Sequence, residues 1–257
     1  MHCNGNSVFE SLVFSVPLPI QNVMAYMHTL SLLIETSGRM CSCALADGDT
    51  VVALEQAEEP NAHSAKLAVL VDTLFGTTGF KYPDLSFVAL SIGPGSYTGL
   101  RIGASSVKGF AYALDIPVVA VPTPLILAKA ASDRHPGSYV LTMIDARRME
   151  VYSNIFDPAL VTVKDCSADV LTEDIYDKYL SGCDSVVLVG DGASKTRVLF
   201  GNKSNYHYDD AVELSAGNMA VLAHEKFLKK EFEDVAYFEP FYLKSFVAVR
   251  SQVKGLY

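Results

Sequence analysis

An order of strands, turns and helices that occurs twice along the chain is the strongest constraint on its fold. Residues 29–56, TLSLLIETSGRMCSCALADGDTVVALEQ, predict two or three strands joined by tight turns, and residues 139–157, YVLTMIDARRMEVYSNIFD, predict a similar pair. Each region is followed by an apolar strand, a glycine turn and a predicted helix, in FVALSIGPGSYTGLRI at 87–102 and SVVLVGDGASKTRVLF at 185–200. This repetition predicts an α/β protein with two similar lobes.

The boundary between the lobes is expected near residues 130–138, where Ser, Asp, Pro and Gly cluster. We assign 27–130 to an N-terminal lobe and 131–257 to a C-terminal lobe that ends in a helix, at about 215–230, and an extended tail. Residues 1–26 contain no Lys or Arg and carry Glu10 near their centre. They fit neither a signal peptide nor a membrane span, so we expect a leader or a disordered extension.

Composition and charge narrow the class of protein. The chain has 257 residues, of which 50% are hydrophobic, and a formal net charge of −9. The apolar content supports a sizeable core, and the negative charge opposes direct binding to nucleic-acid phosphates. The five cysteines lack the paired spacing of a zinc site or a secreted disulfide framework. We expect a soluble, cytoplasmic protein in which Cys41 and Cys43 share one face of a strand and are buried.

The glycine-rich segment SIGPGSYTGLRIGASSVKG, at 91–109, could hold a phosphate or a nucleophile. It lacks the Lys-Ser or Lys-Thr pair of a phosphate-binding loop and the acidic residue that ends the second strand of a dinucleotide site. A nucleophile elbow would need glycines where Pro94 and Thr98 stand, so Ser96 is expected to be a turn or capping residue. His224-Glu225 is followed by Leu228 where a zinc protease would need a second histidine.

Two carboxylates occupy matching turns of the predicted lobes. Glu35 and Asp145 lie where a two-lobed phosphotransferase would hold Mg²⁺ and a nucleotide, with Ser37 and Arg147 in the same turns. Against this function, two arginines follow Asp145 where small residues would let a phosphate approach, and Glu35 is longer than the usual aspartate. The four residues therefore mark a vestigial nucleotide cleft, and a free-standing ATP-dependent phosphotransferase or ATPase is the alternative hypothesis.

Small side chains recur along the helix expected at 98–114, at Gly99, Gly103, Ser106, Gly109 and Ala113. Such a face permits close packing against a helix of another protein or against the sheet of its own lobe, and the sequence leaves both open. The preceding helix has an apolar face formed by Leu67, Leu70, Val71 and Leu74. Side by side, the two helices could form half of a four-helix interface.

Five segments together resemble the bacterial TsaB (YeaZ) family: LLIETSGRMCSCALADGD, AHSAKLAVLVDTLF, FVALSIGPGSYTGLRIGASSVKGFAYALDIPVVAV, MIDARRMEVYSNIF and PFYLKS. The resemblance runs from about residue 27 to residue 244. It implies two tandem actin-like (ribonuclease H-like) lobes, each a mixed sheet flanked by helices. It also implies a non-catalytic scaffold in the complex that forms N6-threonylcarbamoyladenosine at position 37 of tRNAs reading codons that begin with A.

The same resemblance implies partners. They are a TsaD-like catalytic subunit, which carries the metal, and a TsaE-like ATPase, with tRNA bound through the complex; ATP and metal then belong to these partners, and no cofactor is expected here. Where the catalytic relative has a metal-binding His pair, this chain has Thr123 and Leu127, which are poor ligands for a transition metal. Family members bind the catalytic subunit through helices that correspond here to residues 64–75 and 98–114.

The small and apolar faces of those two helices therefore become the predicted surface for the partner, or for a homodimer. Two departures from the family pattern are visible. Glu35 replaces the commoner aspartate, which weakens the nucleotide-binding hypothesis further, and Tyr97 replaces the commoner phenylalanine.

Overall fold

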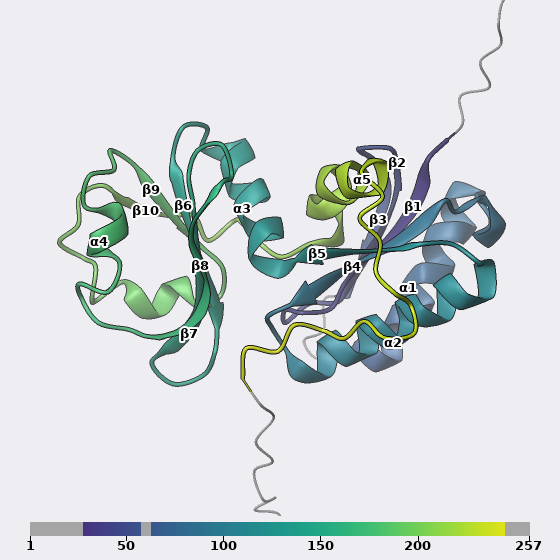
Figure 1. Cartoon of the computed structure of the whole chain (residues 1–257), viewed down its shortest axis with the longest axis horizontal. Coiled ribbons are helices and arrows are strands. Elements are labelled where there is room, and N and C mark those ends of the chain that lie inside the picture. The colour runs from purple at the N-terminus through teal and green to yellow at the C-terminus, as the bar shows by residue number, and fades with distance from the viewer. Residues whose placement is uncertain (1–27, 58–62, 245–257) are drawn as a thin grey trace, which may run out of the picture.

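In the computed structural model, which describes residues 28–57 and 63–244, the chain forms two lobes that lie side by side (Figure 1). Each lobe is built on one five-stranded mixed sheet. The first sheet contains β1 (Leu30–Glu35), β2 (Ser42–Asp47), β3 (Thr50–Gln56), β4 (Phe87–Gly93) and β5 (Val118–Pro122). The second contains β6 (Tyr139–Asp145), β7 (Glu150–Phe156), β8 (Thr162–Val170), β9 (Val186–Val189) and β10 (Tyr206–Tyr208).

The two sheets have the same topology, which confirms the predicted duplication. The first sheet has the order β3-β2-β1-β4-β5, and the second, read from its β8 edge, has the order β8-β7-β6-β9-β10. In each, three consecutive strands pair antiparallel, and two later strands add in parallel beside the first of them. The α/β class with two mixed sheets flanked by helices is thus the observed fold.

Helices cover both faces of the first sheet, which explains why β1 is buried along its whole length. On one face lie α1 (His63–Thr78) and α2 (Tyr97–Leu114), with the single turn η1 (Tyr82–Asp84) between them. On the other face lie η3 (Ala216–Met219) and α5 (Ala220–Leu228) (Figure 1). Side chains of β1 alternate between the two cores, with Leu32 on the α1/α2 side and Leu33 on the α5 side.

The position of α5 corrects the assignment of the C-terminal helix to the second lobe. Ala216, Met219, Ala220 and Ala223 pack in one core cluster with Leu33 and other residues of the first sheet. These side chains are apolar and mostly small, so they lie close over an apolar sheet face that would otherwise face water. The chain therefore returns to its first lobe after completing the second sheet.

The connection between the lobes, expected near residues 130–138, includes a helix. Helix α3 (Thr123–Arg134) occupies the predicted boundary and belongs to both lobes. Its Ile126 lies in the core beneath the first sheet, whereas Leu127, Ala128 and Ala131 lie in a core of the second lobe. A helix that is apolar on two sides must be covered on two sides, and here each lobe covers one.

The second lobe has shorter helices than the repeat predicts. After the glycine turn that follows β9, the chain forms only the 3-10 turn η2 (Ala193–Thr196), and a second short helix, α4 (Asp177–Leu180), precedes β9. Ala193 and Phe200 of the segment after β9 are buried in the core of the second lobe, whereas Val198 is almost fully exposed.

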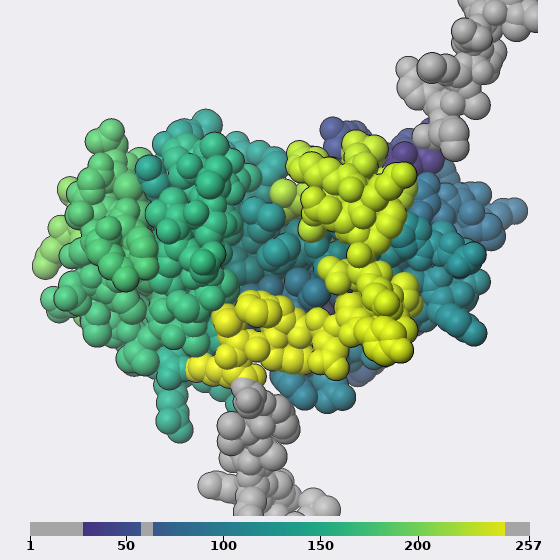
Figure 2. All heavy atoms as spheres, viewed as in Figure 1, coloured from purple at the N-terminus to yellow at the C-terminus, as the bar shows by residue number. Residues whose placement is uncertain are grey.

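Residues 231–244, which follow α5, form an extended segment that we call the C-terminal strap. It crosses the first lobe and reaches the second along one side of the molecule (Figure 2). Its Glu233 forms an antiparallel bridge with Val118 of β5, and the Phe238 side chain is buried in the α1/α2 core. At its end, Lys244 forms an ion pair with Glu150 of the second sheet. The strap thus also belongs to both lobes.

Cys41 and Cys43 are buried and free, as predicted from their spacing. Burial raises the pKa of the Cys41 thiol to about 11, so this thiol is protonated at neutral pH. The expected leader at 1–26 lies outside the described residues. Within the residues that are described, no helix is both long enough and apolar enough to cross a membrane.

Candidate functional site

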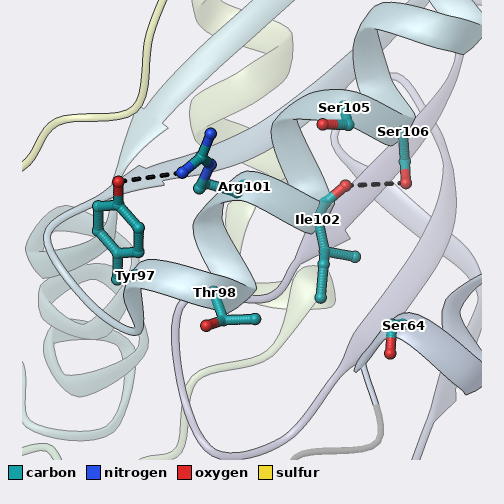
Figure 3. Close-up of a pocket in the computed structure, with 7 residues that line it drawn as sticks. All are labelled: Ser64, Tyr97, Thr98, Arg101, Ile102, Ser105 and Ser106. Carbon is teal, nitrogen blue, oxygen red and sulfur yellow. Dashed lines mark hydrogen bonds between the residues drawn. The ribbon is translucent and has the colours of Figure 1, made fainter. Parts of the chain in front are cut away.

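A groove of about 600 Å³ lies on the surface formed by α1 and α2 (Figure 3). We call it the docking groove. Its lining residues are Ser64, Tyr97, Thr98, Arg101, Ile102, Ser105 and Ser106. All but Ser64 come from the first three turns of α2, at the three- and four-residue spacing that places side chains on one side of a helix.

The start of α2 is set by its capping residue. The Ser96 hydroxyl accepts a hydrogen bond from the Gly99 amide at 3.2 Å, as the sequence predicts for a residue at this position. The cap satisfies one of the amides that the first turn leaves without a helical partner. Ser96 sets the residue at which α2 begins. The direction of each later side chain around the helix axis follows from that starting point, so the cap helps to determine which α2 side chains line the groove.

One end of the docking groove carries a positive charge in a defined orientation. Arg101 donates a hydrogen bond from Nη1 to the Tyr97 hydroxyl at 3.1 Å, and its Cζ lies 5.4 Å from the centroid of the Tyr97 ring. Towards the other end, the Ser106 hydroxyl donates to the Ile102 carbonyl oxygen at 2.9 Å (Figure 3). The groove therefore combines a guanidinium with several hydroxyl groups, which suits polar or anionic groups of a ligand or partner.

The predicted stripe of small residues on α2 is divided between two surfaces. A Cβ added at Gly99 would lie 1.9 Å from the Thr36 carbonyl oxygen, and one at Gly103 would lie 2.3 Å from the Thr36 hydroxyl oxygen. These two glycines therefore serve close packing within the first lobe. Ser106 lines the groove, and Gly109 and Ala113 are exposed, with nothing within 4 Å of a Cβ added at Gly109.

The predicted apolar face of α1 packs inside its own lobe. Leu67, Val71 and Leu74 are buried in the core that α1 and α2 form with the first sheet, and Leu70 packs partly buried against it. Leu67, Val71 and Leu74 are therefore not available to a partner, because the sheet face needs an apolar cover and α1 supplies it. Spacing identified the apolar face correctly, but not the surface that covers it.

Large apolar side chains that the sequence analysis did not single out lie exposed on the same two helices. Val69 of α1 is 57% exposed and Tyr112 of α2 is 88% exposed. Tyr112 stands three residues after Gly109, so it shares the exposed side of α2 with it. The sequence did contain a sign of this exposure, because Val69 and Tyr112 are apolar residues at positions that do not match the three- and four-residue spacing of the buried side of their helices.

Glu35 and Ser37, predicted for the interlobe cleft, build the turn after β1. Glu35 is fully buried, and its Oε1 accepts hydrogen bonds from the Ser37 amide at 2.5 Å and the Ser37 hydroxyl at 2.7 Å. Within the described part of the chain, its Oε2 has no hydrogen-bond partner. Burial raises the pKa of Glu35, and these hydrogen bonds lower it less than burial raises it. Glu35 thus serves the turn rather than presenting a carboxylate to solvent.

Asp145 and Arg147 lie at the corresponding turn of the second lobe. Asp145 Oδ1 accepts from the Arg147 amide at 2.6 Å and pairs with Lys195 Nζ at 2.6 Å, while its own amide donates to Asp191 at 2.8 Å. Arg147 has a φ of 70°, in the left-handed region that side chains rarely adopt. Asp145 is therefore part of a network that joins Arg147, Lys195 and Asp191.

A second cavity, of about 430 Å³, lies between the lobes. It is lined by Gly38, Arg39, Met40, Leu127, Gly190, Asp191, Ser194, Asp210, Val212, Glu213 and Leu214. None of the four predicted cleft residues lines it, although Gly38 follows Ser37 and Asp191 bonds to Asp145. Desolvation of its carboxylate and the nearby Asp145 charge raise the pKa of Asp191.

Thr123 and Leu127 both have structural roles. The buried Thr123 hydroxyl donates to the Ser37 hydroxyl at 3.1 Å, and Leu127 is buried in a core of the second lobe. In the ranges 28–57 and 63–244, no group of three or more His, Cys, Asp or Glu side chains is placed to hold a metal ion.

Several known proteins that this chain resembles are named for the formation of threonylcarbamoyladenosine in tRNA. The model of the TsaD family, tRNA N6-adenosine threonylcarbamoyltransferase, matches residues 51–248. The Escherichia coli tRNA threonylcarbamoyladenosine biosynthesis protein TsaB is 29% identical over 222 residues, which are 84% of this chain and 95% of that protein. The TsaB proteins of Haemophilus influenzae and Bacillus subtilis are 34% and 37% identical over 49% of this chain, and these matches span about half the length of each relative.

Solved structures agree in fold and in family. YeaZ from Pseudomonas aeruginosa superposes with a TM-score of 0.72 and 26% sequence identity, covering 84% of this chain and 100% of that one. The ethanolamine utilization protein EutJ from Carboxydothermus hydrogenoformans, at 10% identity and a TM-score of 0.50, shares the fold alone. With a family model matched over most of its length and relatives named TsaB or YeaZ in both comparisons, this chain belongs to the TsaB (YeaZ) family of the actin-like fold.

Proposed function

We propose that this chain is a scaffold subunit of the complex that forms N6-threonylcarbamoyladenosine at position 37 of tRNAs reading codons that begin with A. In this proposal it binds a TsaD-like catalytic subunit and supplies no catalytic group itself. A TsaE-like ATPase and tRNA join through the complex, and ATP and the metal are held by the partners. The similarity to TsaB proteins of tRNA threonylcarbamoyladenosine biosynthesis and the match to the TsaD family model support this assignment.

The observation that carries the docking proposal is the exposed side of α1 and α2. Their inner sides cover the first sheet, yet their outer sides leave Val69 and Tyr112 in solvent, and the first three turns of α2 also line a groove of about 600 Å³. Gly109, with open space around it, allows a second helix to approach α2 closely. Exposed aromatic anchors next to a concave surface are typical of protein–protein contact sites.

The docking proposal is tested with Gly109→Leu and Tyr112→Ala, which change the exposed side of α2 and touch no core residue. We expect each to weaken binding to the TsaD-like subunit at least about tenfold, because one blocks close approach and the other removes an anchor. Threonylcarbamoyladenosine formation in a reconstituted reaction, measured by mass spectrometry of tRNA nucleosides, should fall in parallel.

Tyr237→Ala is the matched control, because Tyr237 is 84% exposed and lies on the C-terminal strap. It should bind and support modification like the unaltered protein. Wild-type affinity of Gly109→Leu and Tyr112→Ala would refute docking through α2. If the partner binds normally but the isolated variants lose self-association, the surface serves a homodimer.

The phosphotransferase is the alternative function, and the cavity between the lobes is the place where a nucleotide would bind in that case. Titration calorimetry with Mg·ATP separates the two functions. Binding in the micromolar range that Asp145→Ala abolishes would favour the phosphotransferase, whereas the scaffold function predicts no heat of binding.

A further inference from the structure

Arg101 is a cation at the surface of an acidic protein. The chain has a formal net charge of −9, yet Arg101 lines the docking groove, which is also lined by the hydroxyl-bearing Ser64, Thr98 and Ser105. Among the described residues, no carboxylate lies within 4.0 Å of the Arg101 guanidinium. A guanidinium has five N–H donors, and here the Tyr97 hydroxyl accepts from only one nitrogen, Nη1. Among acceptors in the described part of the chain, the guanidinium therefore bonds to the Tyr97 hydroxyl alone.

The guanidinium is held in place before any partner arrives. Tyr97 contacts Arg101 both through its hydroxyl, at 3.1 Å, and through its ring, at 5.4 Å. Tyr97 is in turn packed against Tyr242 of the C-terminal strap, with 4.8 Å between the ring centroids. A side chain that is already ordered loses less conformational entropy on binding, which makes the contact stronger.

The strap is anchored on both sides of this aromatic pair. The Phe241 amide donates to the Ile92 carbonyl oxygen at 2.8 Å, and a Cβ at Gly93 would lie 2.6 Å from the Phe241 carbonyl oxygen, so the strap lies directly on the end of β4. Two residues beyond Tyr242, Lys244 pairs with Glu150 of the second lobe. The position of Tyr242 is thus determined by backbone contacts and by both lobes.

We propose that the docking groove receives a carboxylate side chain from a helix of the partner protein, which binds the Arg101 guanidinium, and that Tyr242 is a positioning residue that holds Arg101 through Tyr97. This inference rests on the proposed scaffold function and adds the chemistry of the contact. Charge complementarity selects the occupant, because a guanidinium in a groove that is also lined by hydroxyl groups suits a carboxylate. The groove lies between α1 and α2, so the carboxylate comes from a helix that packs across them.

The first test removes the positive charge of Arg101. Arg101→Ala should weaken binding of the full-length chain to the TsaD-like subunit about thirtyfold, the effect of losing one well-placed arginine at an interface. Arg101→Lys should recover only part of the affinity, because an ammonium cannot bind a carboxylate with two parallel hydrogen bonds. The salt dependence of the association rate should also decrease in Arg101→Ala. Arg148→Ala, which removes an exposed arginine of the second lobe, is the matched control.

The second test concerns the positioning residue. Tyr242→Ala should weaken binding about threefold, and Tyr242→Phe, which keeps the ring, should restore the affinity. In the Arg101→Ala background, Tyr242→Ala should have no further effect, because the two residues act through one contact. Additive losses would show that Tyr242 acts elsewhere and would overturn its positioning role.

The outcomes separate this inference from the function on which it rests. If Gly109→Leu abolishes binding while Arg101→Ala binds like the unaltered chain, docking through α2 stands and the carboxylate contact is wrong. If the unaltered chain does not bind the TsaD-like subunit, both are wrong. If Arg101→Ala loses only self-association, measured by sedimentation, the occupant is a second copy of this chain and the inferred partner is wrong.

Discussion

Glu35 has a structural role in the turn after β1, although the sequence placed it in a possible nucleotide cleft. Its Oε1 closes the turn after β1 through the Ser37 amide and hydroxyl, and its Oε2 is buried without a hydrogen-bond partner among the described residues. A buried carboxylate in this state is more stable protonated, which is why its pKa is raised.

The raised pKa predicts a pH dependence of stability. Above the ordinary value of 4.5, the folded protein retains the Glu35 proton that the unfolded chain releases. This carboxyl group's contribution to stability is therefore complete below about pH 4.5 and is lost as the pH rises through the pKa of the folded state. Glu35→Gln removes this titration while keeping an oxygen that can accept from Ser37. Urea unfolding at pH 5 and pH 8 should show the stability of the variant rising relative to the unaltered protein at the higher pH.

Glu225→Gln is the control for the loss of a negative charge, because Glu225 is exposed on α5. Its stability difference from the unaltered protein should be nearly the same at both pH values. A Glu35→Gln difference that is equally independent of pH would contradict a raised pKa for Glu35.

At the scale of an element, α2 combines two packing roles on different sides. Its inner side places Gly99 and Gly103 against Thr36 of the turn after β1, and its outer side carries the docking groove, Gly109 and Tyr112. In the sequence the small residues form one stripe, because spacing alone does not show where the neighbours of the helix lie around it. Only the position of the β1–β2 turn divides the stripe.

Alanine substitutions distinguish the two sides of α2. Gly99→Ala places a methyl group against the Thr36 carbonyl oxygen and should cost about 1–3 kcal/mol of unfolding free energy through overpacking. Gly109→Ala meets open space and should stabilise the protein by about 0.5–1 kcal/mol, because alanine favours the helix. Urea titration of both variants measures the difference. Equal effects at the two positions would refute the division of α2 into an inner and an outer side.

At the scale of the whole molecule, two segments join the lobes. Helix α3 contributes Ile126 to one lobe's core and Leu127 to the other's, and the strap runs from β5 to Glu150. The ion pair at the end of the strap is partly exposed and contributes little, about 0–1 kcal/mol. Most of the strap's attachment therefore comes from the buried Phe238 and its backbone contacts.

Phe238→Ala tests this attachment. Phe238 is 7% exposed, so removing its ring should cost about 3–5 kcal/mol and lower the melting temperature. Hydrogen exchange should also become faster at the Glu233 amide, which donates to Val118 of β5. The adjacent Tyr237→Ala should change neither measurement, since Tyr237 is 84% exposed. Unchanged exchange in Phe238→Ala would show that the strap is held by other contacts.

The sequence alone was sufficient to predict the two α/β lobes, the strands of both sheets except β8 and β10, the cap of α2 at Ser96 and the burial of Cys41 and Cys43. These features follow from periodicity, turn residues and capping chemistry, which act over a few neighbouring residues. The tertiary structure alone decided that α5 returns to the first sheet, that α3 is shared, and that Leu67 and Leu74 face inward while Val69 and Tyr112 face solvent. Hydrophobic spacing shows that a helix has an apolar side, but the surface that covers it is set by contacts between residues far apart in the chain.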